Sequence, residues 1–277
     1  MKKIILLLMA NATIFFAGAQ SLKTPSPSTT QMVKQEFGLG SIELNYARPN
    51  MKGRAIFGDL VPFGAIWRTG ANSATTLTFT DDVMVAGTTI PAGKYGLLSI
   101  PGAAEWTIII TKQLDVTSPS AYKKEMDVVR AVVPVQSSMS SVETFQIMFG
   151  NVRTNEIDLV LSWDKTTVSL PIKQDIDSKI MGQIDNLMNK DNRPYFNAAM
   201  YYMDNGKDLA KASLWLDKAV EQTPSAYWVW YQKARCLSLL KKNTEAKAAS
   251  MKSLELAKAA KNPDYVTLNE KLMAGLK

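Results

Sequence analysis

The chain contains no histidine and a single cysteine among its 277 residues. Without histidine it cannot build a Ser-His-Asp or Cys-His nucleophile of its own, a histidine-ligated zinc site or histidine acid–base catalysis. Cys236 has no partner for an internal disulfide, and its apolar helical surroundings predict a buried, unreactive thiol. Any catalysis would therefore depend on carboxylates, on Lys, Tyr, Ser or Thr side chains, or on an oxygen-ligated metal.

Dense blocks of basic residues are also missing. The formal net charge is +7, and loss of Lys2 and Lys3 with the export signal described next would leave +5. These charges are spread along the chain, whereas nucleic-acid-binding proteins gather Lys and Arg with aromatic residues on one surface. We therefore expect no nucleic-acid partner, and nothing in the sequence predicts a cofactor or a metal site.

Residues 1–19 have the features of an export signal peptide. Two lysines precede an apolar run at residues 4–16, which is too short for a comfortable membrane span. Small residues at positions 17–19 predict cleavage before Gln20 rather than a retained membrane anchor, and no cysteine at that point offers a lipid attachment site. We expect a mature chain without a transmembrane span, soluble in the periplasm or outside the cell.

Residues 20–30 are rich in Ser, Thr and Pro and predict a flexible lead-in. Residues 31–173 then show short runs with strand periodicity, separated by turns that contain Gly, Pro or Asp. The runs are 31–37, 41–47, 75–80, 83–85, 88–90, 93–100, 106–111, 128–135, 143–152, 156–163 and 166–172, with a short helix expected at 120–126. Many short strands and few helices predict an antiparallel β sandwich or a flattened barrel.

Near Gln174 the composition changes, and from residue 177 to residue 277 the apolar spacing is helical. The expected helices are 177–189, 194–204, 207–221, 226–241, 244–261 and 263–272. A period of about 34 residues is the tetratricopeptide length. Ala212, Leu216 and Ala219, then Trp230, Ala234, Leu237 and Ala246, fall on pattern positions, whereas Met200, Ser250 and Ser253 depart from it. The predicted fold is thus α+β with two domains, a β domain followed by a tetratricopeptide-like helical domain.

The most distinctive stretch is residues 45–79. Its motifs are Tyr46-x-Arg48-Pro49, Lys52-Gly53-Arg54, the run from Ile56 to Pro62, and Trp67-Arg68-Thr69-Gly70-Ala71-Asn72, followed by Pro91-Ala92-Gly93-Lys94-Tyr95 and the run from Glu105 to Ile109. Over residues 24–173 the chain resembles the bacterial family known as domain of unknown function 2911. The resemblance implies a tetratricopeptide-like tail and says little about function. Residues 113–121 differ from the aromatic segment that the family pattern implies, so a site bordered by them would differ too.

The same stretch supplies the candidate ligand-binding residues. Arginine offers a planar fork of donors that suits carboxylates and phosphates, tryptophan can stack on a sugar ring, and asparagine supplies both donor and acceptor. The alternative is that these side chains brace a long loop that lacks regular backbone hydrogen bonds. The candidates are Arg48, Arg54, Asp59, Trp67, Arg68 and Asn72.

Three functions remain open at this point. The first is a non-enzymatic binding module that holds a small polar or anionic ligand or a glycan on the β domain and a protein partner on the helical tail. The second is a carboxylate- or metal-dependent enzyme acting on polymers of the bacterial envelope. The acids to weigh for it are Asp81, Asp82, Asp175 and Asp177, although carboxylates in a turn or at a helix start usually serve as caps and solvated groups. The third is a structural envelope scaffold. Trp228 lies off the aromatic face of its helix, and if it is exposed we expect it to line a peptide groove.

Overall fold

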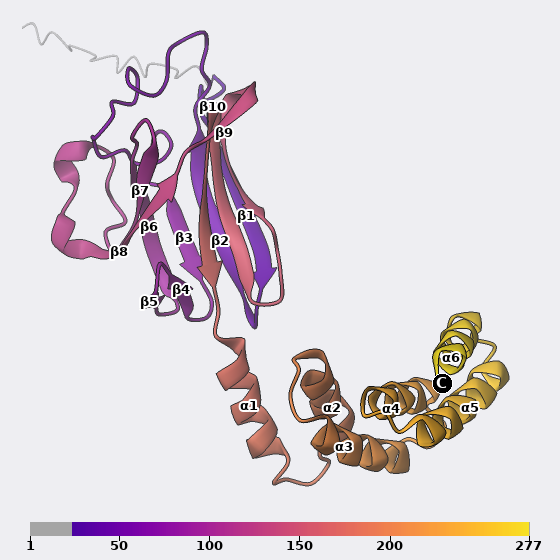
Figure 1. Ribbon diagram of the computed structural model, residues 1–277. Helices are drawn as coiled ribbons and strands as arrows, with labels where there is room; N and C mark the ends of the chain where they lie inside the picture. The colour runs from indigo at the N-terminus through magenta and orange to yellow at the C-terminus, as the bar shows by residue number, and fades with distance from the viewer. Residues whose placement is uncertain (1–23, 277) are drawn as a thin grey trace, which may run out of the picture. The chain divides into compact units, whose positions relative to one another are not determined.

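The computed structural model describes residues 24–276, and the predicted signal peptide and residues 20–23 lie outside this range. The chain divides into two compact units, a β unit that ends at Asp175 and a helical unit that begins at Ile176 (Figure 1). The two are described separately below.

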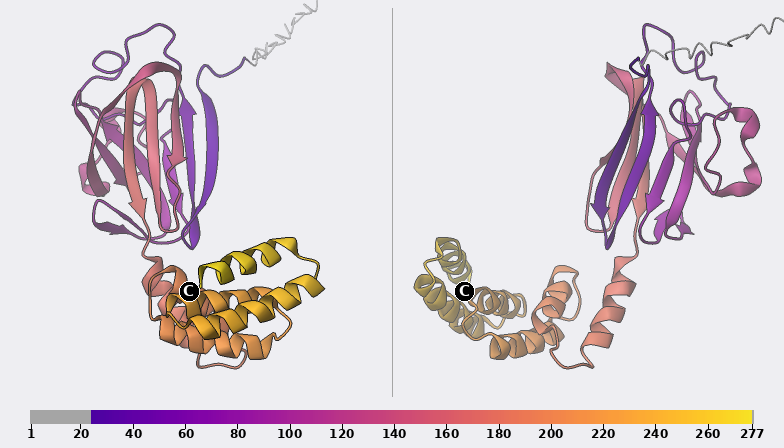
Figure 2. Two further views of the ribbon diagram at one scale, coloured as in Figure 1. Left: turned by 45° about the vertical axis from the view of Figure 1, so that its right-hand side comes forward. Right: turned by 180° about the vertical axis from the view of Figure 1, so that it is seen from behind.

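The β unit contains two antiparallel sheets and is not a closed barrel. One sheet has the order β1-β2-β3-β6-β7-β8 and the other β5-β4-β10-β9, and Figure 2 shows them as two layers. The sandwich is therefore the correct one of the two predicted architectures. The strands are β1 Thr29–Phe37, β2 Gly40–Arg48, β3 Thr76–Phe79, β4 Val83–Val85, β5 Thr88–Ile90, β6 Gly93–Ile100, β7 Glu105–Thr111, β8 Asp127–Pro134, β9 Gln136–Gly150 and β10 Glu156–Lys173.

Alternating side chains from the two sheets fill the space between them. On β2, Ile42 and Leu44 are buried, and on β10, Leu159 and Leu161 are buried against them in one cluster. The period-2 pattern in the sequence identifies these inward positions because successive strand residues point to opposite faces. The main core of the β unit is this inter-sheet layer.

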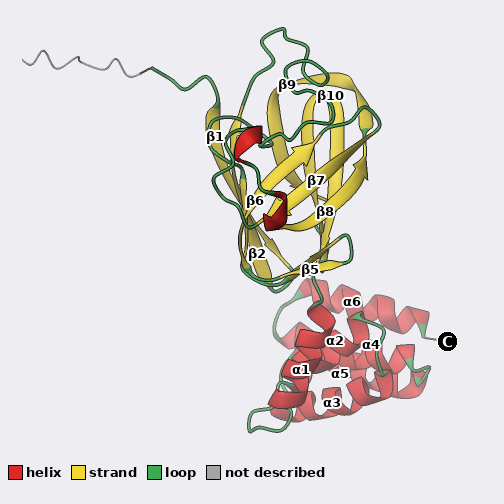
Figure 3. Cartoon of the chain, turned by 90° about the vertical axis from the view of Figure 1, so that its left-hand side faces the viewer, coloured by secondary structure: helices red, strands yellow, loops and turns green. Residues whose placement is uncertain are grey.

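A second, smaller cluster covers the outer face of the six-stranded sheet. Leu98 of β6 and Ile109 of β7 point away from the main core, yet both are buried because Val116 packs on them. Val116 belongs to the connection between β7 and β8, which also contains two single-turn 3-10 helices, Pro119–Ala121 and Lys124–Met126 (red in Figure 3). These turns replace the single short helix expected at 120–126.

β10 is one continuous strand where the sequence suggested two strands and a turn. Its pairing with β9 shifts register on both sides of Asp164, whose φ is +50°. The Asp164 carboxylate accepts a hydrogen bond of 2.8 Å from Ser141. The Asp-Lys pair at 164–165 thus forms a bulge inside the strand, because a residue with positive φ can kink a ladder without ending it.

The free edge of β9 is closed by side chains from the last residues of β2. The Tyr46 hydroxyl accepts from the Ile147 amide at 2.8 Å and lies within donating distance of the Ile147 carbonyl (3.1 Å) and of Gln31 Oε1 (2.8 Å). Arg48 Nε donates to the carbonyl of Phe145 at 3.0 Å. These bonds join the two sheets and satisfy backbone groups that a bare edge would leave unpaired.

The helical unit has six helices within the described residues, at nearly the predicted positions. Ala212, Leu216 and Ala219 are buried, as the repeat pattern requires. The helices are α1 Ile176–Leu187, α2 Tyr195–Asp204, α3 Leu209–Gln222, α4 Tyr227–Leu239, α5 Asn243–Ala259 and α6 Pro263–Gly275. None of the helices within residues 24–276 combines the length and the apolar composition needed to cross a membrane.

A buried polar network explains the two serines that depart from the repeat pattern. Ser250 Oγ donates to Asn269 Oδ1 (2.9 Å), Asn269 Nδ2 donates to Ser253 Oγ (2.8 Å), and Ser253 Oγ donates to the Tyr227 carbonyl (2.7 Å). Small hydroxyl side chains on α5 leave room for the amide of Asn269 on α6. The network thereby joins α4, α5 and α6 in their packed arrangement.

Candidate functional site

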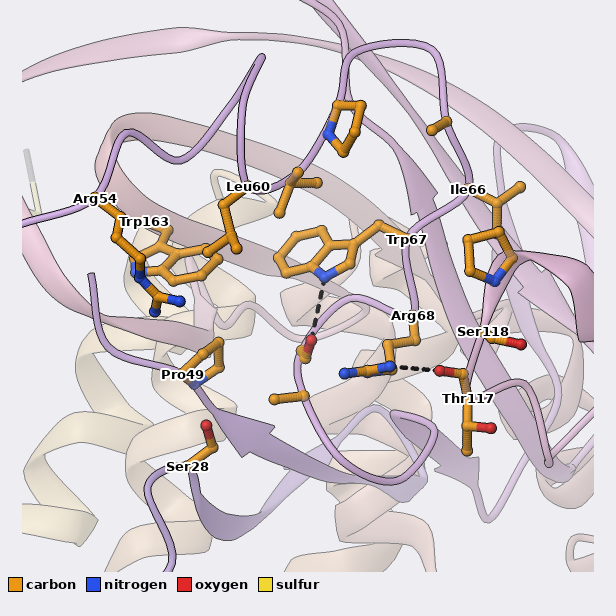
Figure 4. A pocket seen from close by; sticks show the side chains of 16 residues that line it. Ser28, Pro49, Arg54, Leu60, Ile66, Trp67, Arg68, Thr117, Ser118 and Trp163 are labelled. Atoms are coloured by element: carbon orange, nitrogen blue, oxygen red, sulfur yellow. Dashed lines mark hydrogen bonds between the residues drawn. The ribbon is translucent and has the colours of Figure 1, made fainter. Parts of the chain in front are cut away.

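A pocket of about 370 Å³ lies between residues 48–72, here called the arginine loop, and the exposed residues 117–119 (Figure 4). This volume falls within the range of small-molecule sites. The lining residues are Ser28, Pro49, Arg54, Leu60, Val61, Pro62, Ala65, Ile66, Trp67, Arg68, Gly70, Ala71, Thr117, Ser118, Pro119 and Trp163.

The arginine loop is attached to β6 at the pocket. The backbones of Trp67 and Ser99 exchange two hydrogen bonds of 2.8 and 2.9 Å. Thr69 follows with a φ of +55°, a conformation that is strained for a β-branched residue. It is held there because its hydroxyl bonds Ser99 Oγ at 2.9 Å and its carbonyl accepts from Thr75 at 2.7 Å. The segment that carries Trp67 and Arg68 is therefore rigid.

Gly70 fits where another residue would not. A Cβ at this position would lie 2.9 Å from the carbonyl oxygen of Ala47 on β2, and the φ of +151° disfavours other side chains. The carbonyl of Gly70 accepts from Trp67 Nε1 at 3.1 Å, which fixes the indole ring. The glycine of this motif thus sets the orientation of the pocket's aromatic wall.

Trp67 forms that wall together with Trp163. The two rings stack with centroids 5.9 Å apart and planes 15° apart. Behind them lie Phe57, Trp106 and Phe145, each in aromatic contact with Trp67. Trp67 is half-buried whereas Trp163 is buried, so Trp67 connects the main core to the pocket surface.

Arg68 presents a donor that the protein leaves unused. Its Nη1 donates to the carbonyl of Thr117, while its Nε is buried and has no acceptor among the described residues. Figure 4 shows the guanidinium between Thr117 and the middle of the pocket, beside the Trp67 ring. A buried donor without an acceptor costs about 1–3 kcal/mol, and a bound anion would remove that cost.

Arg54 is the second cation of the pocket. It is exposed, but its guanidinium is fixed because Nε donates to the Met51 carbonyl at 2.9 Å and Nη2 to the Asn50 carbonyl at 2.7 Å. The end of the guanidinium that carries Nη1 has no acceptor in these bonds. Arg54 therefore braces its own loop through two backbone carbonyls and keeps one end of its guanidinium free of these bonds.

Three of the six candidates do not line the pocket. Arg48 points to the edge of β9, as described above. Asn72 has a φ of +57° and donates to the Ser28 carbonyl at 3.1 Å. Asp59 is exposed in a turn outside the pocket lining. The structure thus brings together Arg54, Trp67 and Arg68.

The pocket also contains residues that the sequence did not single out. Trp163 comes from β10, and Thr117, Ser118 and Pro119 come from the connection after β7. Their alignment with the arginine loop depends on the sandwich topology, which local patterns do not encode. One feature of the sequence could have pointed to residues 117–119, because they fall within the segment at 113–121 that differs from the family pattern.

The pocket lining contains no carboxylate. The acids considered from the sequence lie elsewhere: Asp82 accepts from the Ala92 amide in a turn, at 2.9 Å, and Asp177 pairs with Lys207 at 2.8 Å. Lys207 and the Tyr201 hydroxyl hold the pKa of Asp177 below its ordinary value. No group of three or more His, Cys, Asp or Glu suited to a metal ion occurs in the part of the chain that the structure describes.

The helical unit has a groove of its own, of about 560 Å³, between α3, α4 and α5. Its walls include Leu214, which is 65 % exposed, and Lys233, which pairs with Asp217 at 2.8 Å. Trp228 is also exposed, at 43 %, and lies outside this groove. The protein partner expected for this unit stays a prediction.

A sequence model of the family described as "Protein of unknown function (DUF2911)" matches residues 28–172. The chain belongs to the DUF2911 family. The DUF2911 match begins beside β1, ends in β10 and includes every strand of the β unit, and the helical unit follows it. No curated protein and no solved structure matches this DUF2911 chain.

Proposed function

We propose that the β unit is a non-enzymatic binding module for a small organic anion with an apolar body. The observation that carries this proposal is the buried Nε of Arg68, a donor without an acceptor on a side chain that lines a preformed pocket. Guanidinium groups with a free edge bind planar anions through two parallel hydrogen bonds. The apolar body of the ligand would pack on Trp67 and its neighbours.

Two further observations support binding rather than catalysis. The lining offers two arginines and no acid, so the pocket attracts anions and lacks the paired carboxylates of hydrolytic enzymes. The strained Thr69 is held by hydrogen bonds to two neighbouring side chains, Ser99 and Thr75, and such strain persists where the surrounding structure overdetermines it, often at ligand sites.

The test is a thermal-shift screen of residues 20–277 against organic anions, sugars, nucleotides and divalent metals. A ligand present at about 100 times its Kd stabilises the native state by about 2.7 kcal/mol, enough for a clear rise in Tm. We expect organic anions to raise the Tm of the wild type and to leave folded Arg68→Ala unchanged. Arg153→Ala, which removes an exposed arginine outside the pocket, is the matched control and should retain the shift.

Different outcomes favour the alternatives. If no anion raises the Tm of the wild type and Arg68→Ala only has a lower Tm, Arg68 braces the loop. The hypothesis of a structural scaffold is then favoured. A shift caused by sugars or metals that survives in Arg68→Ala would place the site elsewhere and revive the enzyme hypothesis.

We further propose that the chain is exported, with cleavage before Gln20. The support is the charged, apolar and small-residue sequence of positions 1–19. Mass spectrometry of the protein recovered from its native host should show an N-terminus at Gln20. A chain that retains residues 1–19 would contradict the proposal.

A further inference from the structure

The two arginines of the pocket keep different edges of their guanidinium groups free. Arg68 uses Nη1 for the Thr117 carbonyl, which leaves the side-on edge formed by Nε and Nη2. Arg54 uses Nε and one hydrogen of Nη2 for the carbonyls of Met51 and Asn50. This leaves the end-on edge, formed by Nη1 and the other hydrogen of Nη2. Each edge presents two parallel donors, the geometry that a carboxylate accepts.

The space between these edges is apolar. Figure 4 shows Arg54 and Arg68 apart from each other among the lining residues, with Leu60 and Trp67 between them. Pro49 and Val61 are further apolar residues of the pocket lining. A ligand that reaches both arginines must therefore have a hydrocarbon body and an anionic group at each end.

Charge balance favours the same ligand. The pocket contains two positive side chains and no negative one. A monoanion would neutralise only one of the two arginines. A dianion would neutralise both, so neither guanidinium would be left without an opposite charge when the ligand covers it. Arg54 is also held in place before binding by its two backbone bonds, so little side-chain entropy is lost when it meets an anion.

From these observations we infer that the ligand is a dicarboxylate with an apolar spacer. One carboxylate lies on the Nε–Nη2 edge of Arg68, the spacer lies along Trp67 and Leu60, and the second carboxylate lies on the end-on edge of Arg54. This inference rests on the proposed anion site and specifies the class of its ligand.

The test compares acids of equal carbon number by isothermal titration calorimetry on residues 20–277. The probes are adipate, suberate and azelate against hexanoate, octanoate and nonanoate. At least one dicarboxylate should bind about fivefold more tightly than its monocarboxylate, the ratio that a favourable exposed ion pair of about 1 kcal/mol gives. In Arg54→Gln this preference should vanish, while the affinity for the monocarboxylate stays the same.

Two other variants separate local from general effects. Arg153→Gln removes an exposed arginine away from the pocket and changes the net charge as Arg54→Gln does, so it should keep the wild-type preference. Arg68→Gln should bind neither class of acid. Arg68→Lys keeps the positive charge but not the forked donors, so it should bind both classes weakly. Circular dichroism checks that each variant is folded.

The outcomes distinguish this inference from the function on which it rests. The dicarboxylate inference would be wrong if the wild type and Arg54→Gln bound both classes of acid with equal affinity. If Arg68→Gln then bound neither class, the proposed anion site would still be supported. Binding of another anion in the thermal-shift screen, with no binding of any dicarboxylate, would also overturn the dicarboxylate inference. If no anion binds at all, the proposed function fails together with the inference.

Discussion

The hydroxyl of Tyr46 is a single atom on which both sheets of the β unit depend. It is buried, and burial raises the pKa of this phenol above its ordinary value, so the group stays protonated at neutral pH. Tyr46→Phe would leave the Ile147 amide without an acceptor in a dry environment. We expect a loss of about 1–3 kcal/mol in the free energy of unfolding, measured by urea denaturation.

Tyr95 provides the matched control for this change. Its hydroxyl makes one bond, to the Pro91 carbonyl at 2.8 Å, and does not join the sheets. Tyr95→Phe should cost about 1 kcal/mol or less, the usual net value of one hydrogen bond. Equal losses of unfolding free energy in the two variants would show that the bonds of Tyr46 between the sheets contribute no more than an ordinary hydrogen bond.

Cys236 is expected to be inert until the helical unit unfolds. The thiol is buried, and desolvation raises its pKa to about 11. Because the folded-state pKa exceeds the value of about 8.5 for an unfolded cysteine, its contribution to stability is complete below that lower pKa. It is lost as the pH rises toward the folded-state value.

Thiol titration with Ellman's reagent checks this prediction. At pH 8 the native protein should react at least tenfold more slowly than the protein in denaturant, and Cys236→Ala should abolish the reaction in both. Rapid reaction of the native protein would show an accessible thiolate.

At the scale of single residues, the sequence predicted part of the pocket lining. Arg54, Trp67 and Arg68 lie close together in the chain, so one local motif places them together. Trp163 and Thr117 come from distant segments that only the sheet pairing brings near. Arg48 and Asn72 have donor groups suited to a ligand, yet backbone carbonyls take them, because an irregular loop must satisfy its own polar groups first.

At the scale of elements, α6 depends on a buried amide. Asn269 is fully buried and bonds two serines of α5. Asn269→Ala would break these bonds and leave a void, so we expect a loss of about 2–4 kcal/mol, in the range measured for buried polar and cavity-forming changes. Urea denaturation followed by far-UV circular dichroism measures it.

The control lies on the same helix. Thr267 bonds only the Pro263 carbonyl and is exposed, so Thr267→Ala should change stability by less than about 0.5 kcal/mol. A comparable loss in both variants would mean that α6 itself, and not the network, determines the effect.

The helices were more predictable than the last strand. Helical apolar spacing is a property of neighbouring residues, so all six helices could be located from it. The bulge at Asp164 depends on its pairing with β9, and the same Asp-Lys pair is equally typical of a hairpin turn. The sequence alone therefore could not distinguish one long strand from two short ones.

At the scale of the whole molecule, the two units have separate cores, one between two sheets and the others between helices. We expect differential scanning calorimetry to show two unfolding transitions. Tyr46→Phe should lower the temperature of one transition, and Asn269→Ala should lower that of the other. If either variant shifts both transitions equally, the chain unfolds as one cooperative body.

The small cluster on the outer face of the six-stranded sheet has an evolutionary consequence. Val116 is anchored on Leu98 and Ile109, while the next three residues, Thr117, Ser118 and Pro119, are exposed at the pocket rim. Anchor and rim are thus adjacent in the chain, but the anchor is buried and the rim is exposed. If the pocket is the anion site proposed above, substitutions at the rim would alter what it accepts while the anchor preserves folding, so new specificities would arise in this scaffold by changes to a few neighbouring codons.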